Sequence, residues 1–167
     1  MMAFDAERWH DFYVMSGGAA AALAGLLFVA MSLHARTVMS NLFYRNRAVG
    51  MLTSLTTQLL LSAAVLVPDQ PVRLLGAEVA AASLFWLGVA LRAIFAREPG
   101  AGSIPISRFR MWAEVVAGLT WNALFIVSGL SLLTEIGAGL YLLAVVMVFA
   151  FGWNIYVAWV LMTEISE

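Results

Sequence analysis

Residues 12–34 read FYVMSGGAAAALAGLLFVAMSLH, an uncharged apolar run that is long enough to cross a lipid bilayer. When the run is drawn as a helix, its small residues form a single stripe, because their spacing follows the helical repeat. The stripe consists of Gly17, Gly18, Ala21, Ala22 and Gly25. In lipid, such a stripe lets a second helix approach closely. The sequence therefore predicts a membrane helix with a helix-packing face.

Four further apolar runs follow, at residues 48–67, 74–96, 112–133 and 140–162. At about 1.5 Å per residue, some 20 residues span a hydrocarbon core of about 30 Å. Residues 3–11 are amphipathic, contain a tryptophan and are acidic, which favours an interfacial segment over a cleaved signal peptide. We therefore predict an all-α, polytopic transmembrane bundle of five spans that forms a single domain over residues 1–167.

The composition also favours a membrane protein. Hydrophobic residues make up 63% of the chain and charged residues 11%, against about 25% charged in soluble domains. The net charge of −1 argues against a nucleic-acid partner, because no basic patch exists to neutralise phosphates. The absence of cysteine excludes disulfides, thiolate metal sites and a cysteine nucleophile.

The distribution of arginine predicts the orientation of the spans. The link after the first run holds three arginines and the link after the third holds three more, whereas the second link has one and the fourth has none. The positive-inside rule places the first and third links in the cytoplasm. The N-terminus is then outside and the C-terminus is cytoplasmic.

The second and fourth runs resemble each other. Arg45-Asn46-Arg47 precedes one and Arg108-Phe109-Arg110 precedes the other, and each run then carries an amide, Gln58 or Asn122. This pattern fits a parallel repeat of two helical hairpins, and it also fits chance similarity among apolar segments.

Polar side chains at membrane depth are the main candidates for function, because lipid cannot solvate them. The deepest amides are Gln58, Asn122 and Asn154. They either join helices through hydrogen bonds or line a polar path together with nearby hydroxyl groups. The hydroxyl groups that would complete such a path belong to Thr53, Thr56, Thr57 and Thr120.

Glu78 lies near the expected outer end of the third run. As a cation or proton site it would be joined by His10, Asp11 and Glu135 at the same level. As a structural residue it would reach interfacial water or pair with Arg73, and its shallow depth favours this interpretation.

Arg92 and Glu114 lie near the expected inner ends of consecutive runs. An ion pair that ties the third and fourth helices together is the simplest interpretation, and a transport role is the alternative.

Enzyme chemistry has little support in this sequence. It contains no nucleophile with an adjacent base, no Walker loop, no dinucleotide fingerprint and no HExxH motif. The two histidines, His10 and His34, are expected on opposite faces of the membrane and cannot share a metal ion within one chain. We expect neither an enzyme nor a bound metal or cofactor.

The beginning of the chain resembles a known family. Trp9-His10-Asp11-Phe12, followed by GGAAAALAGLLFVAMSL at residues 17–33, is similar to the opening of a group of small uncharacterised bacterial integral-membrane proteins. Some of these are labelled as modulators of a membrane-bound AAA protease. The resemblance implies location in a bacterial inner membrane.

Two classes of function fit these features. One is a small oligomeric channel or carrier for ions, protons or a small solute, and the polar groups at mid-depth favour it. The other is a non-transporting accessory protein that binds another membrane protein through small-residue helix faces. In both classes the lipid bilayer is the surrounding medium, and the small-residue stripe favours a homo-oligomer.

Overall fold

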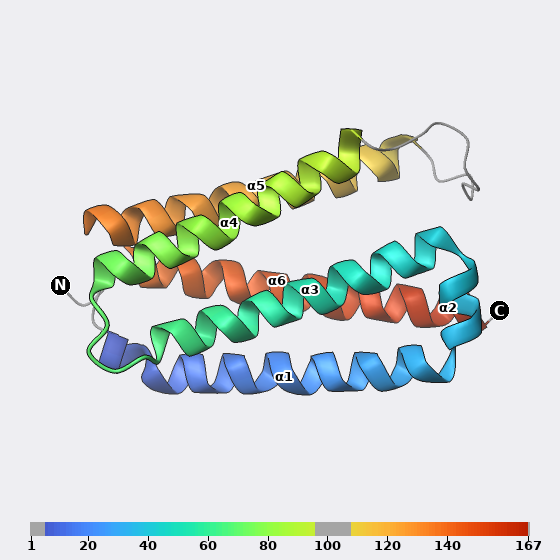
Figure 1. The fold of residues 1–167 in the computed structure, drawn as a ribbon, viewed down its shortest axis with the longest axis horizontal. Coiled ribbons are helices and arrows are strands. Elements are labelled where there is room, and N and C mark those ends of the chain that lie inside the picture. The colour runs from blue at the N-terminus through green and yellow to red at the C-terminus, as the bar shows by residue number, and fades with distance from the viewer. Residues whose placement is uncertain (1–5, 96–107, 167) are drawn as a thin grey trace. The chain divides into compact units, whose positions relative to one another are not determined.

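The computed structural model describes residues 6–95 and 108–166 (Figure 1). The part of the chain it describes contains one 3-10 turn, six α-helices and no strand. The elements are η2 (Ala6–Trp9), α1 (His10–Leu33), α2 (Ala35–Ser40), α3 (Leu42–Val65), α4 (Val72–Phe95), α5 (Arg108–Thr134) and α6 (Gly139–Ser166). The predicted all-α class is confirmed, and each of the five apolar runs coincides with one long helix.

Three helical segments within the described residues are long and apolar enough to cross a membrane. They are Glu7–Leu33, Tyr44–Val65 and Gly139–Thr163, and α5 adds a shorter apolar segment, Gly118–Thr134. These segments indicate that the protein associates with a membrane.

The helices begin earlier than the apolar runs. α3 starts at Leu42, although hydropathy predicts a start near residue 48. Hydropathy marks the part of a helix that lipid can cover, whereas the helix itself continues through Arg45 and Arg47. Residues 35–40, expected as a polar link, form the short helix α2, and its Val38 is buried in the hydrophobic core that α1, α3 and α6 share.

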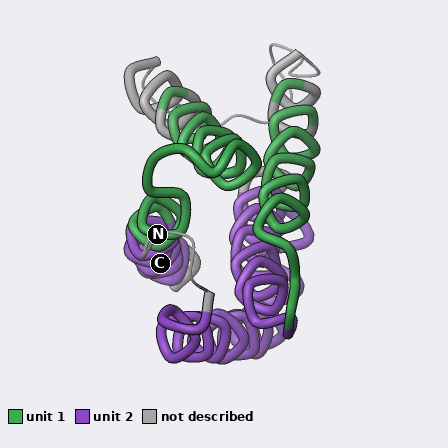
Figure 2. Tube along the Cα trace, turned by 90° about the vertical axis from the view of Figure 1, so that its left-hand side faces the viewer, with its two compact units in different colours: residues 1–5, 69–146 green, residues 6–68, 147–167 purple. Residues whose placement is uncertain are grey.

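The chain folds as two compact units, which Figure 2 colours separately. The α4–α5 unit has residues 69–146 as its main segment, and the α1–α3 unit contains residues 6–68 together with 147–167. Helix α6 contributes its first residues to the α4–α5 unit and the remainder to the α1–α3 unit.

In the α1–α3 unit, α1 and α3 lie side by side (Figure 1). Gly17 on α1 is buried against Ser62 on α3, and a β-carbon on this glycine would lie only 3.0 Å from the Ser62 Cβ. Further along the helices, buried side chains of α1, α3 and α6 form a hydrophobic core. Its members from these three helices are Leu27, Ala48, Met51, Leu55, Val157 and Leu161.

In the α4–α5 unit, α4 and α5 pack backbone to backbone. A methyl group on Gly76 would overlap the backbone nitrogen of Leu133, and one on Gly129 would lie 2.8 Å from the backbone nitrogen of Ala80. Small residues make this close approach possible, as is typical of helix pairs in membranes.

A Schellman motif ends α5. Glu135 adopts a left-handed conformation with φ 55°, the Ile136 amide donates to the Ser131 carbonyl at 3.2 Å, and the Glu135 amide donates to the Leu132 carbonyl at 3.4 Å. The motif turns the chain toward α6 and presents Glu135 at this end of the α4–α5 unit.

Candidate functional site

A row of polar side chains runs along one face of α3. Ser54, Gln58 and Ser62 are four residues apart, so they lie one above another over about 12 Å of the helix. Gln58 and Ser62 are each only 1% exposed. We call this row and the side chains bonded to it the α3 polar cluster.

At one end of the α3 polar cluster, the row is bonded to α1. The Ser62 and Ser16 hydroxyl oxygens are 3.2 Å apart, and the Ser16 hydroxyl also donates to the Tyr13 carbonyl at 3.3 Å. Ser16 is 2% exposed and lies beside Gly17, whose lack of a side chain allows α1 to come this close. The hydroxyl pair therefore joins α1 and α3.

At the other end, the row is bonded to α6. Asn154 donates from Nδ2 to the Ser54 Oγ at 2.9 Å, and Gln58 donates from Nε2 to the same oxygen at a long 3.5 Å. Asn154 is 6% exposed. Buried side chains from three helices of the α1–α3 unit thus meet in one polar cluster.

One atom of this cluster has no partner. The Gln58 Oε1 is buried, and no group in the described part of the chain donates a hydrogen bond to it. Exchanging the oxygen and nitrogen of the amide does not remove the problem, because the other atom then lacks a partner. An unsatisfied buried polar group costs about 1–3 kcal/mol, and a hydrogen bond from a small molecule to the open amide atom would remove this cost.

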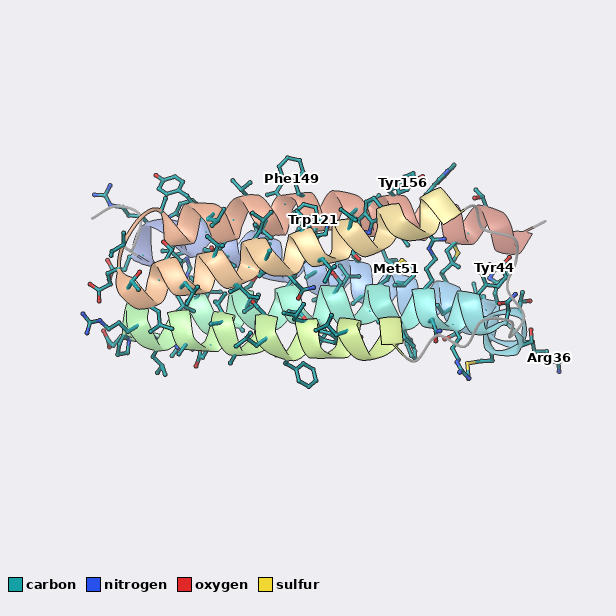
Figure 3. All side chains as sticks on the ribbon, turned by 90° about the horizontal axis from the view of Figure 1, so that it is seen from above. Arg36, Tyr44, Met51, Trp121, Phe149 and Tyr156 are labelled. Carbon is teal, nitrogen blue, oxygen red and sulfur yellow. The ribbon has the colours of Figure 1, made fainter. Side chains whose placement is uncertain are left out.

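An apolar groove of about 200 Å³ borders the cluster. Its walls come from α1, α3 and α6 and include Leu23, Leu27, Met51 and Leu55; Met51 is labelled in Figure 3. Asn154 is the one polar residue among the described side chains that line it. The groove therefore meets the α3 polar cluster at Asn154.

The threonines predicted for a polar path bond to their own helices. The hydroxyls of Thr56, Thr57 and Thr120 donate to the carbonyls four residues earlier, at 2.8, 2.9 and 2.8 Å respectively. Thr53 is half-buried and supplies the carbonyl that Thr57 bonds to. Of the predicted hydroxyls, none is bonded to Gln58 or Asn154 among the interactions found in the described residues.

Of the three predicted amides, the structure brings Gln58 and Asn154 together around Ser54. Asn122 lies in the α4–α5 unit and donates from Nδ2 to the Gly118 carbonyl of its own helix at 3.0 Å.

The carboxylates of the α4–α5 unit have local partners. Gln70 donates from Nε2 to the Glu78 Oε2 at 2.8 Å, and Arg73 donates from Nε to the Glu135 Oε1 at 2.9 Å. The alternative that Arg73 pairs with Glu78 is therefore wrong, because the left-handed turn at the end of α5 brings Glu135 to the arginine instead.

The structure gives no support to a metal site at the outer ends of the helices. His10 and Asp11 are exposed neighbours whose side chains approach to 3.2 Å. Within residues 6–95 and 108–166, no group of three or more His, Asp or Glu side chains could hold a metal ion. Arg92 and Glu114 belong to α4 and α5, but their side chains lie outside the described residues.

The predicted packing face of α1 divides into two parts. Gly17 is buried against α3, whereas Gly18, Ala21, Ala22 and Gly25 are exposed. The face that α1 turns to its own chain is instead formed by Tyr13, Ser16, Gly17 and Ala20. The interface within the chain is therefore displaced by about one residue from the small-residue stripe.

The serines that complete the cluster are not among the site residues predicted from the sequence. Ser54, Gln58 and Ser62 repeat at intervals of four residues, which is the helical signal of a shared face. Threonine content alone does not identify this face, because each threonine hydroxyl can bond to a carbonyl of its own helix.

Comparisons of the chain with protein-family models, curated proteins and solved structures found no match. The fold and its long apolar helices define an all-α, membrane-associated protein with a buried polar cluster.

Proposed function

We propose that the protein is a multi-pass protein of a bacterial inner membrane, with α1, α3, α4, α5 and α6 as five spans. The N-terminus lies outside and the C-terminus lies in the cytoplasm. The support is the length of the helices, the arginine-rich first and third links, and the resemblance carried by residues 9–12 and 17–33. α4 and α5 contain 24 and 27 residues, long enough for spans of about 30 Å.

The absence of cysteine allows a direct test of this topology. Ser40→Cys in α2 and Ile136→Cys in the turn before α6 both replace exposed residues. In intact cells, a membrane-impermeant maleimide is expected to label Ile136→Cys at once and Ser40→Cys only after permeabilisation. The opposite labelling pattern, or equal labelling of both variants, would contradict the proposed orientation.

Within this topology, the protein acts as a small channel or carrier, and the α3 polar cluster is its solute path or binding point. The observation that supports this role is the buried, unpartnered Oε1 of Gln58 near the middle of the predicted second span. Polar groups that serve packing alone form hydrogen bonds with one another, whereas a group that also binds a solute keeps one hydrogen-bonding atom without a protein partner. The support applies to the cluster around Gln58 and Asn154 and not to the threonines.

Transport is tested with purified full-length protein in liposomes. Uptake of at least one species from a panel of protons, K⁺, Na⁺, chloride and small neutral solutes is expected to exceed uptake by empty liposomes. Gln58→Met keeps the side-chain length and removes the amide, so it is expected to lower this uptake several-fold. Uptake equal to that of empty liposomes for the whole panel would refute the transport function.

A second function, as a non-transporting accessory protein, is favoured by a different observation. Gly18 and Gly25 are exposed on α1, and within the described part of the chain nothing lies within 4 Å of a β-carbon placed on either. A helix from a second copy or from another membrane protein can pack closely on such a surface. In this role the exposed glycines, and not Gly17, control assembly.

A further inference from the structure

We propose that the α3 polar cluster and the adjoining groove bind a small, uncharged molecule that has hydroxyl or amide groups on a short carbon skeleton. Glycerol and urea are of this chemical class. The inference rests on the proposed transport function and specifies its solute. Four properties of the α1–α3 unit lead to it: the absence of charge, the open amide atom of Gln58, the apolar walls and the volume.

The absence of charge argues against an ion. Residues 12–33, 48–67 and 147–163 contain no Asp, Glu, Lys or Arg, so the α1–α3 unit offers no counter-charge at membrane depth. Taking an ion out of water is costly unless a charge or several oriented dipoles replace its hydration. A neutral solute does not meet this cost.

The open amide atom of Gln58 defines which group of the solute binds. This atom accepts a hydrogen bond as the oxygen and donates one as the nitrogen of the exchanged amide, so the matching group on the solute is one that can do either, a hydroxyl or an amide. Asn154 lines the groove, whereas Gln58 does not, and the two amides are linked through the Ser54 hydroxyl, to which both donate. A solute with two or more hydroxyl or amide groups can therefore exchange its hydration for these contacts.

The groove defines the remainder of the solute. Apart from Asn154, its described walls are apolar, including Leu23 and Leu27 from α1 and Met51 and Leu55 from α3. Apolar walls accept the C–H surface of a polyol without a desolvation penalty. The volume of about 200 Å³ is below the about 300–1,000 Å³ of sites for drug-sized ligands, so the solute is small.

The test measures selectivity in liposomes that contain the full-length protein. Glycerol and urea entry is followed by light scattering after an osmotic step, and K⁺ and proton entry by ion-sensitive dyes. For the unaltered protein, glycerol or urea permeability is expected to exceed that of empty liposomes at least several-fold, while K⁺ and proton entry remains at the level of empty liposomes.

The variants locate this permeability in the protein. Gln58→Met and Asn154→Leu are expected to reduce it about tenfold, the order expected for the loss of one hydrogen bond. Leu60→Met is the matched control, because it places methionine on α3 two residues from Gln58, at a side chain that is 63% exposed. This control is expected to keep the permeability of the unaltered protein.

The outcomes separate this inference from the transport function. K⁺ or proton entry without glycerol or urea entry would overturn the inference and leave transport standing. If neither these species nor any other tested solute enters, both the inference and the transport function are overturned. Neutral-solute entry that Gln58→Met and Asn154→Leu both leave unchanged would overturn the assignment to the α3 polar cluster. The selectivity of the unaltered protein decides the solute class even where a variant fails to fold.

Discussion

Alanine at Gly76 or Gly129 is expected to destabilise the α4–α5 unit strongly. A methyl group on Gly76 would overlap the Leu133 backbone nitrogen, and one on Gly129 would lie 2.8 Å from the Ala80 backbone nitrogen. Backbone atoms cannot rotate away as a side chain can, so the two helices must separate. Overpacking of this kind costs about 1–3 kcal/mol, and contact with backbone lies at the upper end of that range or beyond it.

Gly88→Ala on α4 is the matched control. No atom of the described residues lies within 4 Å of a β-carbon placed on Gly88, so alanine fits there without displacing any of them. Alanine is also a better helix former than glycine by about 1 kcal/mol, so the control is expected to be neutral or slightly stabilising. The measurement is the midpoint of thermal unfolding in detergent. Equal midpoints for Gly76→Ala and Gly88→Ala would contradict the close approach of α4 and α5.

Leucine at Gly17 is expected to separate α1 from α3, whereas leucine at Gly18 is expected to leave the α1–α3 unit intact. A β-carbon on Gly17 would lie 3.0 Å from the Ser62 Cβ, and the rest of a leucine side chain would extend into α3. Separation would also break the contact between the Ser16 and Ser62 hydroxyls, while Ser16 keeps its hydrogen bond to the Tyr13 carbonyl of its own helix. We expect overpacking to lower the free energy of unfolding by about 1–3 kcal/mol, and loss of the hydroxyl contact to lower it further.

The comparison of Gly17→Leu with Gly18→Leu separates folding from assembly. A β-carbon on Gly18 meets no described residue within 4 Å, so Gly18→Leu is expected to keep the unfolding midpoint of the unaltered protein. If the protein is an accessory protein, Gly18→Leu and Gly25→Leu reduce recovery of its partner or its own oligomer at normal stability. A lower unfolding midpoint for Gly18→Leu than for Gly17→Leu would show that α1 packs against α3 through Gly18 and not through Gly17.

The choice between the two proposed functions depends on how the polar residues are used. Asn154 and Ser54 form a hydrogen bond between helices, which serves stability in either function. Gln58 is different, because one of its amide atoms is buried and has no hydrogen-bond partner among the residues that the structure describes. Transport explains this feature, while the exposed glycines of α1 fit an accessory role, so the liposome and assembly measurements address separate parts of the molecule.

The sequence alone determined that this protein is an all-α chain of long apolar helices. A continuous apolar run of about 20 residues permits few structures other than a helix, because the backbone groups must bond within the segment. The positions of the five long helices follow from this rule, and only their polar ends differ from the prediction. The deep location of Gln58 and Asn154 in their runs could also be read from hydropathy.

The tertiary structure decided which polar and small residues meet. Ser54 joins Gln58 and Asn154 although a hundred residues separate Ser54 from Asn154, and no local pattern encodes which face of α6 turns to α3. The same limit applies to residues 12–34, where five small residues form a smooth stripe but only Gly17 is buried against α3. Helical periodicity identifies residues that share a face, while the direction of that face is set by the fit of side chains on neighbouring helices.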